Sequence, residues 1–347
     1  MNHSTYMQKA IELAKLGHLS VAPNPMVGCI IIRDDKIIAE GYHKKFGEAH
    51  AEVNAINSLG PDFDFSNCTL VVNLEPCSHH GKTPPCSDLI IAKKFRKVII
   101  ANTDPNPLVS GKGIEKLKKA GIEIESGVLE KEGYELNKRF FTFHSKKRPY
   151  IILKWAQTND GFISKDPLPK HKEENWISSS ESKKLAHEWR AEEQAIMIGT
   201  TTATSDDPEL TVRLTKGKNP LRIVLDKDLK LDPKLKIFND ASETLVFTGL
   251  QKDRNKNIGY CRIDFSYDVL KQVLEQLHHL NITSLIIEGG TTLLQNFISE
   301  GLWDEARIFV NPYKNFGKGI KAPEFDLSNA TQERSGSDHL YTIKNPH

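Results

Sequence analysis

Short apolar runs alternate with amphipathic stretches along most of the chain, which predicts strands that alternate with helices. The first block opens with apolar residues at helical spacing over 4–16 and closes near residue 127. Between these points the pattern predicts, in order, strands MVGCIIIR and KIIAEGYH, helix HAEVNAINSLG, strand CTLVVNLE, helix CSDLIIAKKF, strand KVIIAN, helix GIEKLKKAG and strand IEIESG. This alternation is typical of a sheet with parallel strands and helices on both faces.

A second block of the same kind follows a charged stretch, HSKKRP at 144–149, which ends in proline and is typical of a domain boundary. Its expected strands are YIILKWAQ, AIMIG, LRIVLD, TLVFTG, YCRIDF, SLIIEGG and EARIFVNP. Helices are expected near 180–191, 266–280 and 291–301. Since 347 residues exceed what one hydrophobic core usually supports, we predict two α/β domains, 1–147 and 148–347.

Composition and charge exclude several classes of protein. A formal net charge of +2 over the whole chain gives no sign of a nucleic-acid-binding groove or of an acidic partner. The first 20 residues mix Lys and His with apolar residues and lack the apolar core of a signal peptide, and no later apolar run is long enough to span a bilayer. We therefore expect a soluble, cytoplasmic protein with neither a nucleic-acid nor a membrane partner.

The chain has five cysteines, an odd number, and no secretion signal, so a disulfide framework is not expected. A metal-binding or catalytic role for some of these cysteines is therefore favoured. Cys29, Cys68 and Cys261 lie in apolar, strand-like runs, where cysteine acts as a small packing residue. Cys77 and Cys86 instead lie in the loop PCSHHGKTPPC. The spacing of this pair alone leaves a disulfide or two idle thiols open.

The stretch HAE at 50–52 gives the two loop cysteines a chemical meaning. A catalytic zinc needs three protein ligands, an open fourth position and a nearby carboxylate that carries protons without binding the metal. His50, Cys77 and Cys86 supply the ligands, and Glu52 in the same helical turn as His50 supplies the carboxylate. Zinc-dependent nucleobase deaminases carry this arrangement as H-x-E followed by P-C-x-x-C, although here eight residues separate the cysteines.

Two other classes of protein stay open at this point. His79 or His80 as a fourth ligand would make the zinc site purely structural, as in a zinc-stabilised binding protein, which would not need Glu52. A nucleic-acid-editing deaminase would share the zinc ligands and carry a basic, aromatic-lined groove around them. A near-neutral charge and 8% aromatic residues argue against that groove.

The stretch SLIIEGGTTLLQNF, near residue 290, combines a buried strand, a glycine pair and a helix start. Free amides at the start of a helix can receive a phosphate group, so this turn is a candidate cofactor site. The pattern is not G-x-G-x-x-G, and a Gly-Gly turn after a strand occurs in many α/β proteins. The residues alone leave both interpretations open.

Several longer stretches together resemble one family, the bifunctional deaminase–reductases of riboflavin biosynthesis. They are PNPMVGCI, GYHKKFGEAHAEVNA, EPCSHHGKTPPC and DPNPLVSGKGI in the first half, and LKWAQTNDGFIS, WRAEEQAIMIGTTTATSDDPELTVR and IEGGTTLL in the second. The resemblance implies a cytidine-deaminase-like three-layer α/β/α domain over 1–147, then a dihydrofolate-reductase-like α/β domain over 148–347. It also implies two cofactors, one Zn²⁺ per chain and NADPH.

In the first domain the resemblance places the zinc on His50, Cys77 and Cys86 and makes Glu52 the proton shuttle. It also implies five substrate-binding residues: Asn24, His43, Lys82, Asp104 and Asn106. The chemistry of these side chains is compatible, since a lysine in a Gly-Lys loop suits a phosphate and an asparagine suits a pyrimidine edge. A proline-stiffened turn capped by Asp104 is the other interpretation of the stretch DPNP.

In the second domain the resemblance implies a cofactor site and a site for the ribosyl phosphate. NADPH is expected to contact Ala156, Trp176, Thr202, Asp206, Gly290, Thr291 and Thr292. The ribosyl phosphate is expected to contact Arg190, Leu210 and Arg213, with Glu288 near the ribose. A guanidinium matches phosphate oxygens in pairs, although either arginine could instead be a surface ion-pair partner. Two departures from the family are left out of the site: Glu174, where many relatives have serine, and Lys227, where others have a small polar residue.

The implied chemistry has two steps on a small-molecule pyrimidine. Zinc-dependent hydrolysis converts 2,5-diamino-6-(5-phosphoribosylamino)pyrimidin-4(3H)-one to 5-amino-6-(5-phosphoribosylamino)uracil. NADPH then reduces the ribosyl group to ribityl. Asp206 and Glu288 are candidates for the proton donor of this second step. The sequence leaves a homo-oligomer open.

Overall fold

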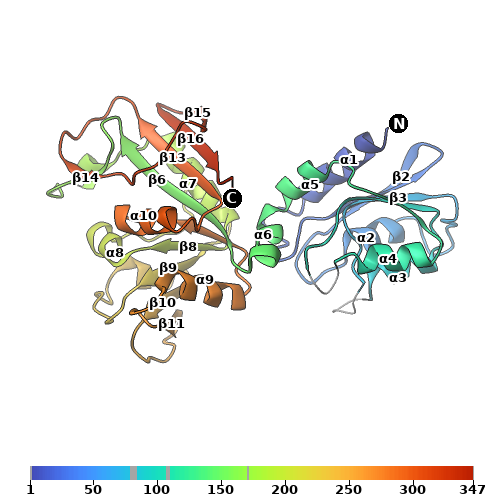
Figure 1. Cartoon of the computed structure of the whole chain (residues 1–347), viewed down its shortest axis with the longest axis horizontal. Helices are drawn as coiled ribbons and strands as arrows, with labels where there is room; N and C mark the ends of the chain where they lie inside the picture. Colours follow the sequence, from blue (N-terminus) through green and yellow to red (C-terminus); the bar gives the residue numbers. More distant parts are fainter. Residues whose placement is uncertain (1, 79–83, 107–109, 170–171, 347) are drawn as a thin grey trace. The chain divides into compact units, whose positions relative to one another are not determined.

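The computed structural model of the protein describes residues 2–78, 84–106, 110–169 and 172–346. The chain divides into two compact units, Met1–Lys147 and Arg148–His347 (Figure 1). Each unit has its own large sheet and its own hydrophobic core, so each is described by itself.

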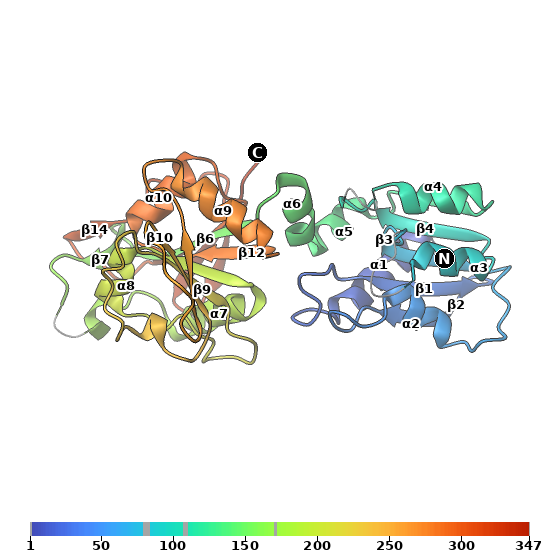
Figure 2. The same ribbon diagram turned by 90° about the horizontal axis from the view of Figure 1, so that it is seen from below.

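The first unit is a five-stranded sheet between two layers of helices (Figure 1 and Figure 2). In chain order its elements are α1 (His3–Lys15), β1 (Gly28–Arg33), β2 (Lys36–Tyr42), α2 (Ala51–Asn57), β3 (Thr69–Leu74), α3 (Cys86–Ala92), β4 (Lys97–Asn102), α4 (Lys112–Lys119), β5 (Glu123–Ser126), α5 (Glu130–Leu136) and α6 (Lys138–Lys146). The strand order is β2-β1-β3-β4-β5. Strands β3, β4 and β5 run parallel, and β1 is antiparallel to both of its neighbours.

Alternating side chains of the strands fill the cores on the two faces of this sheet. In β1, Cys29 and Ile31 pack with helices α2, α3 and α4, whereas Ile30 and Ile32 pack with α1. This alternation follows from the two-residue period of a strand. Because both faces are covered, the strands are apolar at nearly every position, which is why they were recognisable as unbroken apolar runs.

The second unit contains a nine-stranded sheet in the order β11-β10-β9-β8-β12-β6-β13-β16-β15, and a separate pair, β14-β7. Its elements are β6 (Tyr150–Thr158), β7 (Phe162–Lys165), η1 (Lys172–Asn175), α7 (Ser180–Glu192), β8 (Ala195–Ile198), α8 (Thr200–Asp206), β9 (Leu221–Leu225), η2 (Lys236–Phe238), β10 (Thr244–Thr248), β11 (Ile258–Arg262), α9 (Val269–His279), β12 (Ser284–Ile287), α10 (Thr291–Ser299), β13 (Glu305–Asn311), β14 (Gly319–Lys321), β15 (Thr331–Ser335) and β16 (Asp338–Lys344). The strands from β11 to β13 are parallel, and β16 and β15 continue the sheet in antiparallel fashion.

Helices cover both faces of this larger sheet. Residues of α9 and α10 pack on one face, and residues of α7 and α8 pack on the other. The central strands β8 and β12 are buried at every position, as expected for parallel strands between two helical layers. Within the described ranges, no helix combines the length and the apolar character needed to cross a membrane.

The predicted alternation of strands and helices is confirmed in both units. The prediction missed helices α5, α6 and α8 and strands β7, β14, β15 and β16. Strand β15 is exposed at four of its five positions, so no hydrophobic pattern marked it. The stretch HSKKRP, predicted as a domain boundary, is helical in its first three residues, because α6 ends at Lys146.

Candidate active sites

The three predicted zinc ligands converge at the ends of three elements of the first unit. His50 is the N-cap of α2, Cys77 follows the end of β3, and Cys86 opens α3. The Nδ1 atom of His50 lies 3.6 Å from Cys77 Sγ and 3.3 Å from Cys86 Sγ, and the three atoms lie within 4.8 Å of one another. Nitrogen and sulfur donors bound tetrahedrally to one zinc ion are about 3.6 Å apart. The chemistry and the spacing of this donor set therefore fit zinc.

The electrostatics of the cluster favour a metal-binding form of the cysteines. The hydrogen bond with Cys86 lowers the pKa of Cys77 to about 4, and the backbone amide of Cys86 also donates to Cys77 Sγ at 3.3 Å. The same pairing raises the pKa of Cys86, and the hydrogen bond with Cys77 raises the pKa of His50. Both cysteines are free of disulfide bonds. The lowered pKa of Cys77 favours its thiolate, which is the form that binds a metal.

Glu52 lies beside this cluster in the first turn of α2, with 3% of its surface exposed. Burial raises the pKa of its carboxyl group, although His50 opposes the shift. A carboxyl group with a raised pKa can take up and release a proton nearer to neutral pH. Its position and its chemistry are those required of a proton shuttle.

Asn24 and His43 form a hydrogen-bonded pair next to the cluster. Their Nδ2 and Nε2 atoms are 3.2 Å apart, and His43 Nδ1 lies 3.1 Å from the carbonyl oxygen of Ala49. If His43 Nδ1 donates to that carbonyl, Nε2 accepts from the Asn24 amide, and burial lowers the pKa of His43 in favour of this neutral ring. The rings of His43 and His50 meet edge to face at 5.6 Å. The structure thus brings both predicted substrate residues to the metal cluster.

Asp104 and Asn106 form a tight turn. The backbone N–H of Asn106 donates to Asp104 Oδ1 at 2.8 Å. This is the turn capped by Asp104 that the stretch DPNP offered as an alternative to substrate binding. Burial raises the pKa of Asp104 to about 7. Lys82, together with His79 and His80, lies outside the described residues, so its predicted contact with substrate stays a prediction.

Three buried polar residues that the sequence analysis missed hold the segments around this site. Glu75 accepts backbone N–H groups of Asp104, Gly111, Gly113 and Ile114 at 2.9–3.1 Å. Asn73 and Asn137 hydrogen-bond the backbone of Met26 and Gly28, which fixes the segment after Asn24. Glu75 was visible in the stretch EPC, but nothing local in the sequence indicates its partners.

In the second unit, Arg190 and Glu288 form a buried, two-pronged ion pair. Arg190 Nε and Nη2 donate to the two oxygens of Glu288 at 3.1 and 2.7 Å. Lys154 Nζ lies 3.7 Å from the same carboxylate, and it is a further residue that the sequence analysis did not single out. Although burial works against the charged form, Arg190 and Lys154 lower the pKa of Glu288 to about 2. Arg190 is thus half of an ion pair, as the alternative held, but the pair is buried and not on the surface.

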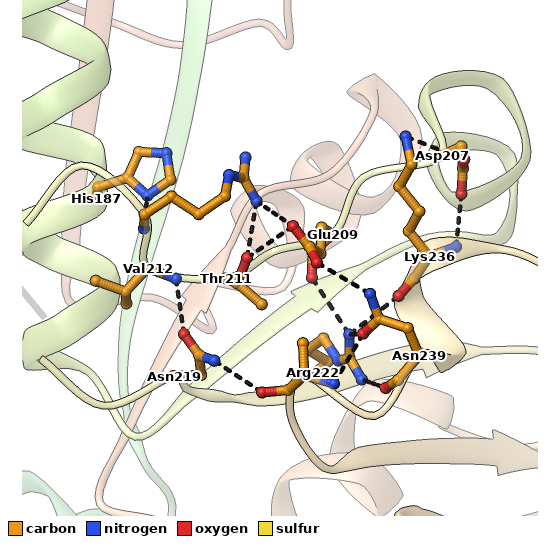
Figure 3. A network of polar contacts seen from close by, with 11 residues as sticks. His187, Asp207, Glu209, Thr211, Val212, Asn219, Arg222, Lys236 and Asn239 are labelled. Carbon is orange, nitrogen blue, oxygen red and sulfur yellow. Dashed lines mark hydrogen bonds and ion pairs between the residues drawn. The ribbon is translucent and has the colours of Figure 1, made fainter.

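Arg213 and Leu210 lie on a loop after α8. A polar network that includes Glu209, Arg222 and Asn239 holds this loop in place (Figure 3). Leu210 is buried and takes a left-handed backbone conformation with φ of 57°. Arg213 Nη1 donates to Glu209 and to Thr211 at 2.9 and 2.8 Å. The buried Arg222 anchors the loop, because its guanidinium donates to the carbonyl of Glu209 and to four acceptors between residues 236 and 242.

The predicted cofactor turn links two helix starts. The N–H of Gly290 donates to Thr202 Oγ1 at 2.9 Å, which ties the turn before α10 to the first turn of α8. A Cβ atom on Gly289 would come within 2.9 Å of the end of the Leu293 side chain, so Leu293 would have to shift to admit a larger residue. The first backbone N–H groups of α10 have no partner within the helix, and a phosphate can accept from them. The turn at Gly290 therefore fits a nucleotide phosphate. Of the two threonines that follow, Thr291 donates through Oγ1 to the carbonyl of Lys321, and Thr292 is exposed.

Other predicted cofactor residues lie on separate elements. Ala156 is in β6, and Asp206 is the exposed last residue of α8. Trp176 is 54% exposed, and Lys183 Nζ lies 3.8 Å from the centre of its indole ring. No hydrogen bond within the described ranges joins Ala156 or Trp176 to the Gly290 turn. Glu174 lies 3.7 Å from Lys165, which offsets the negative charge that departs from the family pattern.

Two family models match the chain. The model described as the RibD C-terminal domain matches residues 149–329. The model described as the cytidine and deoxycytidylate deaminase zinc-binding region matches residues 1–102. The first range contains the metal cluster and Glu52 but ends before Asp104 and Asn106, and the second contains Arg190, Arg213, Glu288 and the Gly290 turn.

Whole proteins of known name are also similar. The riboflavin biosynthesis protein RibD of Aquifex aeolicus is 42% identical over 93% of this chain and 90% of its own length, and its Escherichia coli counterpart is 34% identical over 90% and 88%. Among solved structures, a diaminohydroxyphosphoribosylaminopyrimidine deaminase/5-amino-6-(5-phosphoribosylamino)uracil reductase from Thermotoga maritima matches with a TM-score of 0.86 and 37% identity, over 99% of this chain and 98% of its own. RibD from Acinetobacter baumannii matches with a TM-score of 0.87 and 33% identity, over 99% of both chains.

Proposed function

This chain belongs to the RibD family of riboflavin biosynthesis proteins, and on that premise we propose which of its residues carry the two reactions. The protein is a bifunctional enzyme, a zinc-dependent pyrimidine deaminase and an NADPH-dependent reductase. It deaminates the diaminopyrimidinone ribosyl phosphate and then reduces the ribosyl group of the product. The observation that carries the residue assignment is the cluster of His50, Cys77 and Cys86 with the buried Glu52 beside it.

In the deaminase unit, His50, Cys77 and Cys86 hold the metal and Glu52 moves the proton. Zinc held by these residues supplies the Lewis acidity that makes water a nucleophile near neutral pH. Glu52 takes a proton from the attacking water and returns it to the amino group that leaves the ring carbon as ammonia. Burial raises the pKa of Glu52 toward neutral pH. The carboxylate can therefore accept the proton, and the resulting carboxylic acid can release it again.

Asn24, His43, Asp104, Asn106 and Lys82 are proposed to bind the substrate in this unit. The side-chain NH₂ group of Asn24 donates to His43. The side-chain oxygen of Asn24 can then accept a hydrogen bond from the pyrimidine ring. His43 stays neutral because burial lowers its pKa, so it fixes Asn24 without adding charge next to the metal ligands. The anchored backbone of Met26 keeps this pair in position.

In the reductase unit, Arg190, Arg213 and Leu210 are proposed to hold the ribosyl phosphate, with Glu288 near the ribose. NADPH supplies the hydride when it is bound. The remaining contacts to the cofactor are proposed for Ala156, Trp176, Thr202, Asp206, Gly290, Thr291 and Thr292. Glu209 and Glu288 each fix one edge of an arginine side chain, so the guanidinium groups are already oriented before substrate arrives.

Glu288 does not suit the role of proton donor for the reduction. Arg190 and Lys154 hold its pKa at about 2, so the carboxyl group carries no proton at neutral pH. Its charge instead suits a hydroxyl group of the ribose, which can donate to it. Asp206 stays a candidate donor at the end of α8.

The two alternative functions are not favoured. Neither an editing deaminase with an accessory domain nor a non-catalytic zinc protein accounts for the match of nearly the whole chain to RibD proteins. A pyrimidine ribosyl phosphate is a small-molecule substrate, and nothing indicates a nucleic-acid or membrane partner. A cytoplasmic location and a homo-oligomeric state stay predictions.

The direct test is to incubate the purified full chain with the diaminopyrimidinone ribosyl phosphate. Ammonia should be released without NADPH, and NADPH should be oxidised only after deamination. A Cys77→Ser variant that keeps its fold should release no ammonia. Ammonia release by wild type and by Cys77→Ser at equal rates would contradict the assignment of the metal site.

A further inference from the structure

His187 is a buried imidazole with one nitrogen committed to the protein. It lies on α7 one turn before Arg190 and is 7% exposed. The backbone N–H of Arg213 donates to its Nδ1 at 3.1 Å (Figure 3). Because Nδ1 is the acceptor, the proton of the neutral ring is on Nε2. Burial, assisted by the charges of Arg190 and Arg213, lowers the pKa of His187 to about 4, so the ring is neutral under ordinary conditions.

The Nε2–H group is left unused by the part of the chain that the structure describes. No residue in the described ranges hydrogen-bonds to it, and it is not among the fully enclosed side-chain atoms that lack a partner. It therefore opens onto space that solvent or a ligand can reach. The charged groups that act on the ring are Arg190, Arg213, Lys154 and Glu288. Together with Glu209, which pairs with Arg213, these groups carry three positive and two negative charges, and the positive excess favours an anion as the ligand of this space.

The two arginines beside His187 also keep donors for a ligand. Arg190 uses Nε and Nη2 on Glu288, and its Nη1 hydrogen-bonds to no described residue. Arg213 uses Nη1 on Glu209 and Thr211, and its Nη2 likewise has no described partner. Each guanidinium is thus fixed along one edge and open along another. Together with His187 they present three sets of donors, contributed by α7 and by the loop after α8.

We propose that the Nε2–H group of His187 is a third hydrogen-bond donor to the phosphate of the ribosyl substrate, beside Arg190 and Arg213. The proposal rests on the reductase function and adds a residue to it. A phosphate monoester has three terminal oxygens, so an uncharged donor adds a contact without adding another buried cation. The tautomer is already set by Arg213, and the donor therefore needs no proton rearrangement when substrate binds.

A purely structural role for His187 would be to hold the loop of Arg213 through Nδ1. Substitutions separate the two roles. Glutamine offers both an acceptor and an uncharged donor and can replace both functions, whereas alanine removes both. If His187 acts only through Arg213, then His187→Ala has no further effect once Arg213 is alanine. If it binds phosphate directly, the second substitution adds a further loss.

The experiment measures NADPH oxidation by the full chain with deaminated substrate, with and without its 5-phosphate. His187→Ala should lower kcat/KM about tenfold to hundredfold for the phosphorylated substrate and leave the unphosphorylated one unchanged, since hydrogen bonds to charged groups have about this worth. His187→Gln should stay within about threefold of wild type for one replaced hydrogen bond. His279→Ala, an exposed histidine on α9, serves as the control and should match wild type.

Each outcome has one meaning. An equal loss with both substrates, a loss in His187→Gln as large as in His187→Ala, or no added loss on the Arg213→Ala background would overturn a direct contact with phosphate. Unchanged NADPH oxidation with the unphosphorylated substrate reports that the second unit is folded in each variant, whereas ammonia release reports only on the first unit. Failure of the wild type to oxidise NADPH with deaminated substrate would instead overturn the proposed reductase function, and this inference with it.

Discussion

Glu52→Gln is the most informative single substitution in the deaminase unit. It replaces the oxygen that carries the proton and nearly conserves the side chain's volume. A positioned general acid or base contributes about 10²–10⁴ in rate, so deamination should fall by that factor, which corresponds to about 2.7–5.5 kcal/mol in activation free energy. Because burial raises the pKa of Glu52, a neutral amide there removes the cost of a buried charge. We therefore expect no loss in the free energy of unfolding.

Two assays on the same preparation test this reasoning. Metal analysis should find about one zinc ion per chain in Glu52→Gln, because the three ligands are His50, Cys77 and Cys86. Ammonia release should be lost, while Glu48→Gln, an exposed residue on the loop before α2, should behave as wild type. Loss of zinc from Glu52→Gln would make Glu52 a ligand and refute its role as a proton shuttle. Retention of both zinc and full activity would refute it as well.

The remaining predictions concern the two units. Residues 1–147 and 148–347 expressed separately should each show cooperative unfolding, because each has its own sheet and core; failure of both to fold would show that the units are not independent domains. In the full chain, Arg222→Met should lower the free energy of unfolding of the second unit by about 3–5 kcal/mol in chemical denaturation, since it strips buried carbonyl groups of a charged donor. The exposed Arg254→Met should change it by less than about 1 kcal/mol, and equal effects of the two substitutions would contradict this account.

The zinc site was predictable from the sequence because its signals are local. His50 and Glu52 are two residues apart at a helix start, and Cys77 and Cys86 lie at the ends of a strand and a helix that apolar runs had already marked. Ends of strands and helices in a sheet with parallel strands meet at one edge, so local patterns were enough to bring these groups together. The same apolar runs also predicted that helices would cover both faces of each sheet.

The residues that support the sites were not predictable in this way. Asn137 is 111 positions from Met26, and His187 is 26 positions from Arg213. A hydrogen bond between such distant residues leaves no periodic pattern in the sequence. Glu75 illustrates the same point, since a glutamate at the end of a strand does not show that four backbone N–H groups will surround it. Only the folded chain brings these partners together.

The central claim is that two independent active sites lie on one chain. The proposed zinc ligands belong to Met1–Lys147, and Arg190, Arg213 and Glu288 belong to Arg148–His347. The most direct measurement compares Cys77→Ser with Arg213→Ala in ammonia release from the diamino substrate and in NADPH oxidation with deaminated substrate. We predict that Cys77→Ser abolishes only ammonia release, and that Arg213→Ala lowers only NADPH oxidation, about tenfold to hundredfold. Loss of both activities in either variant while it remains folded would contradict the account.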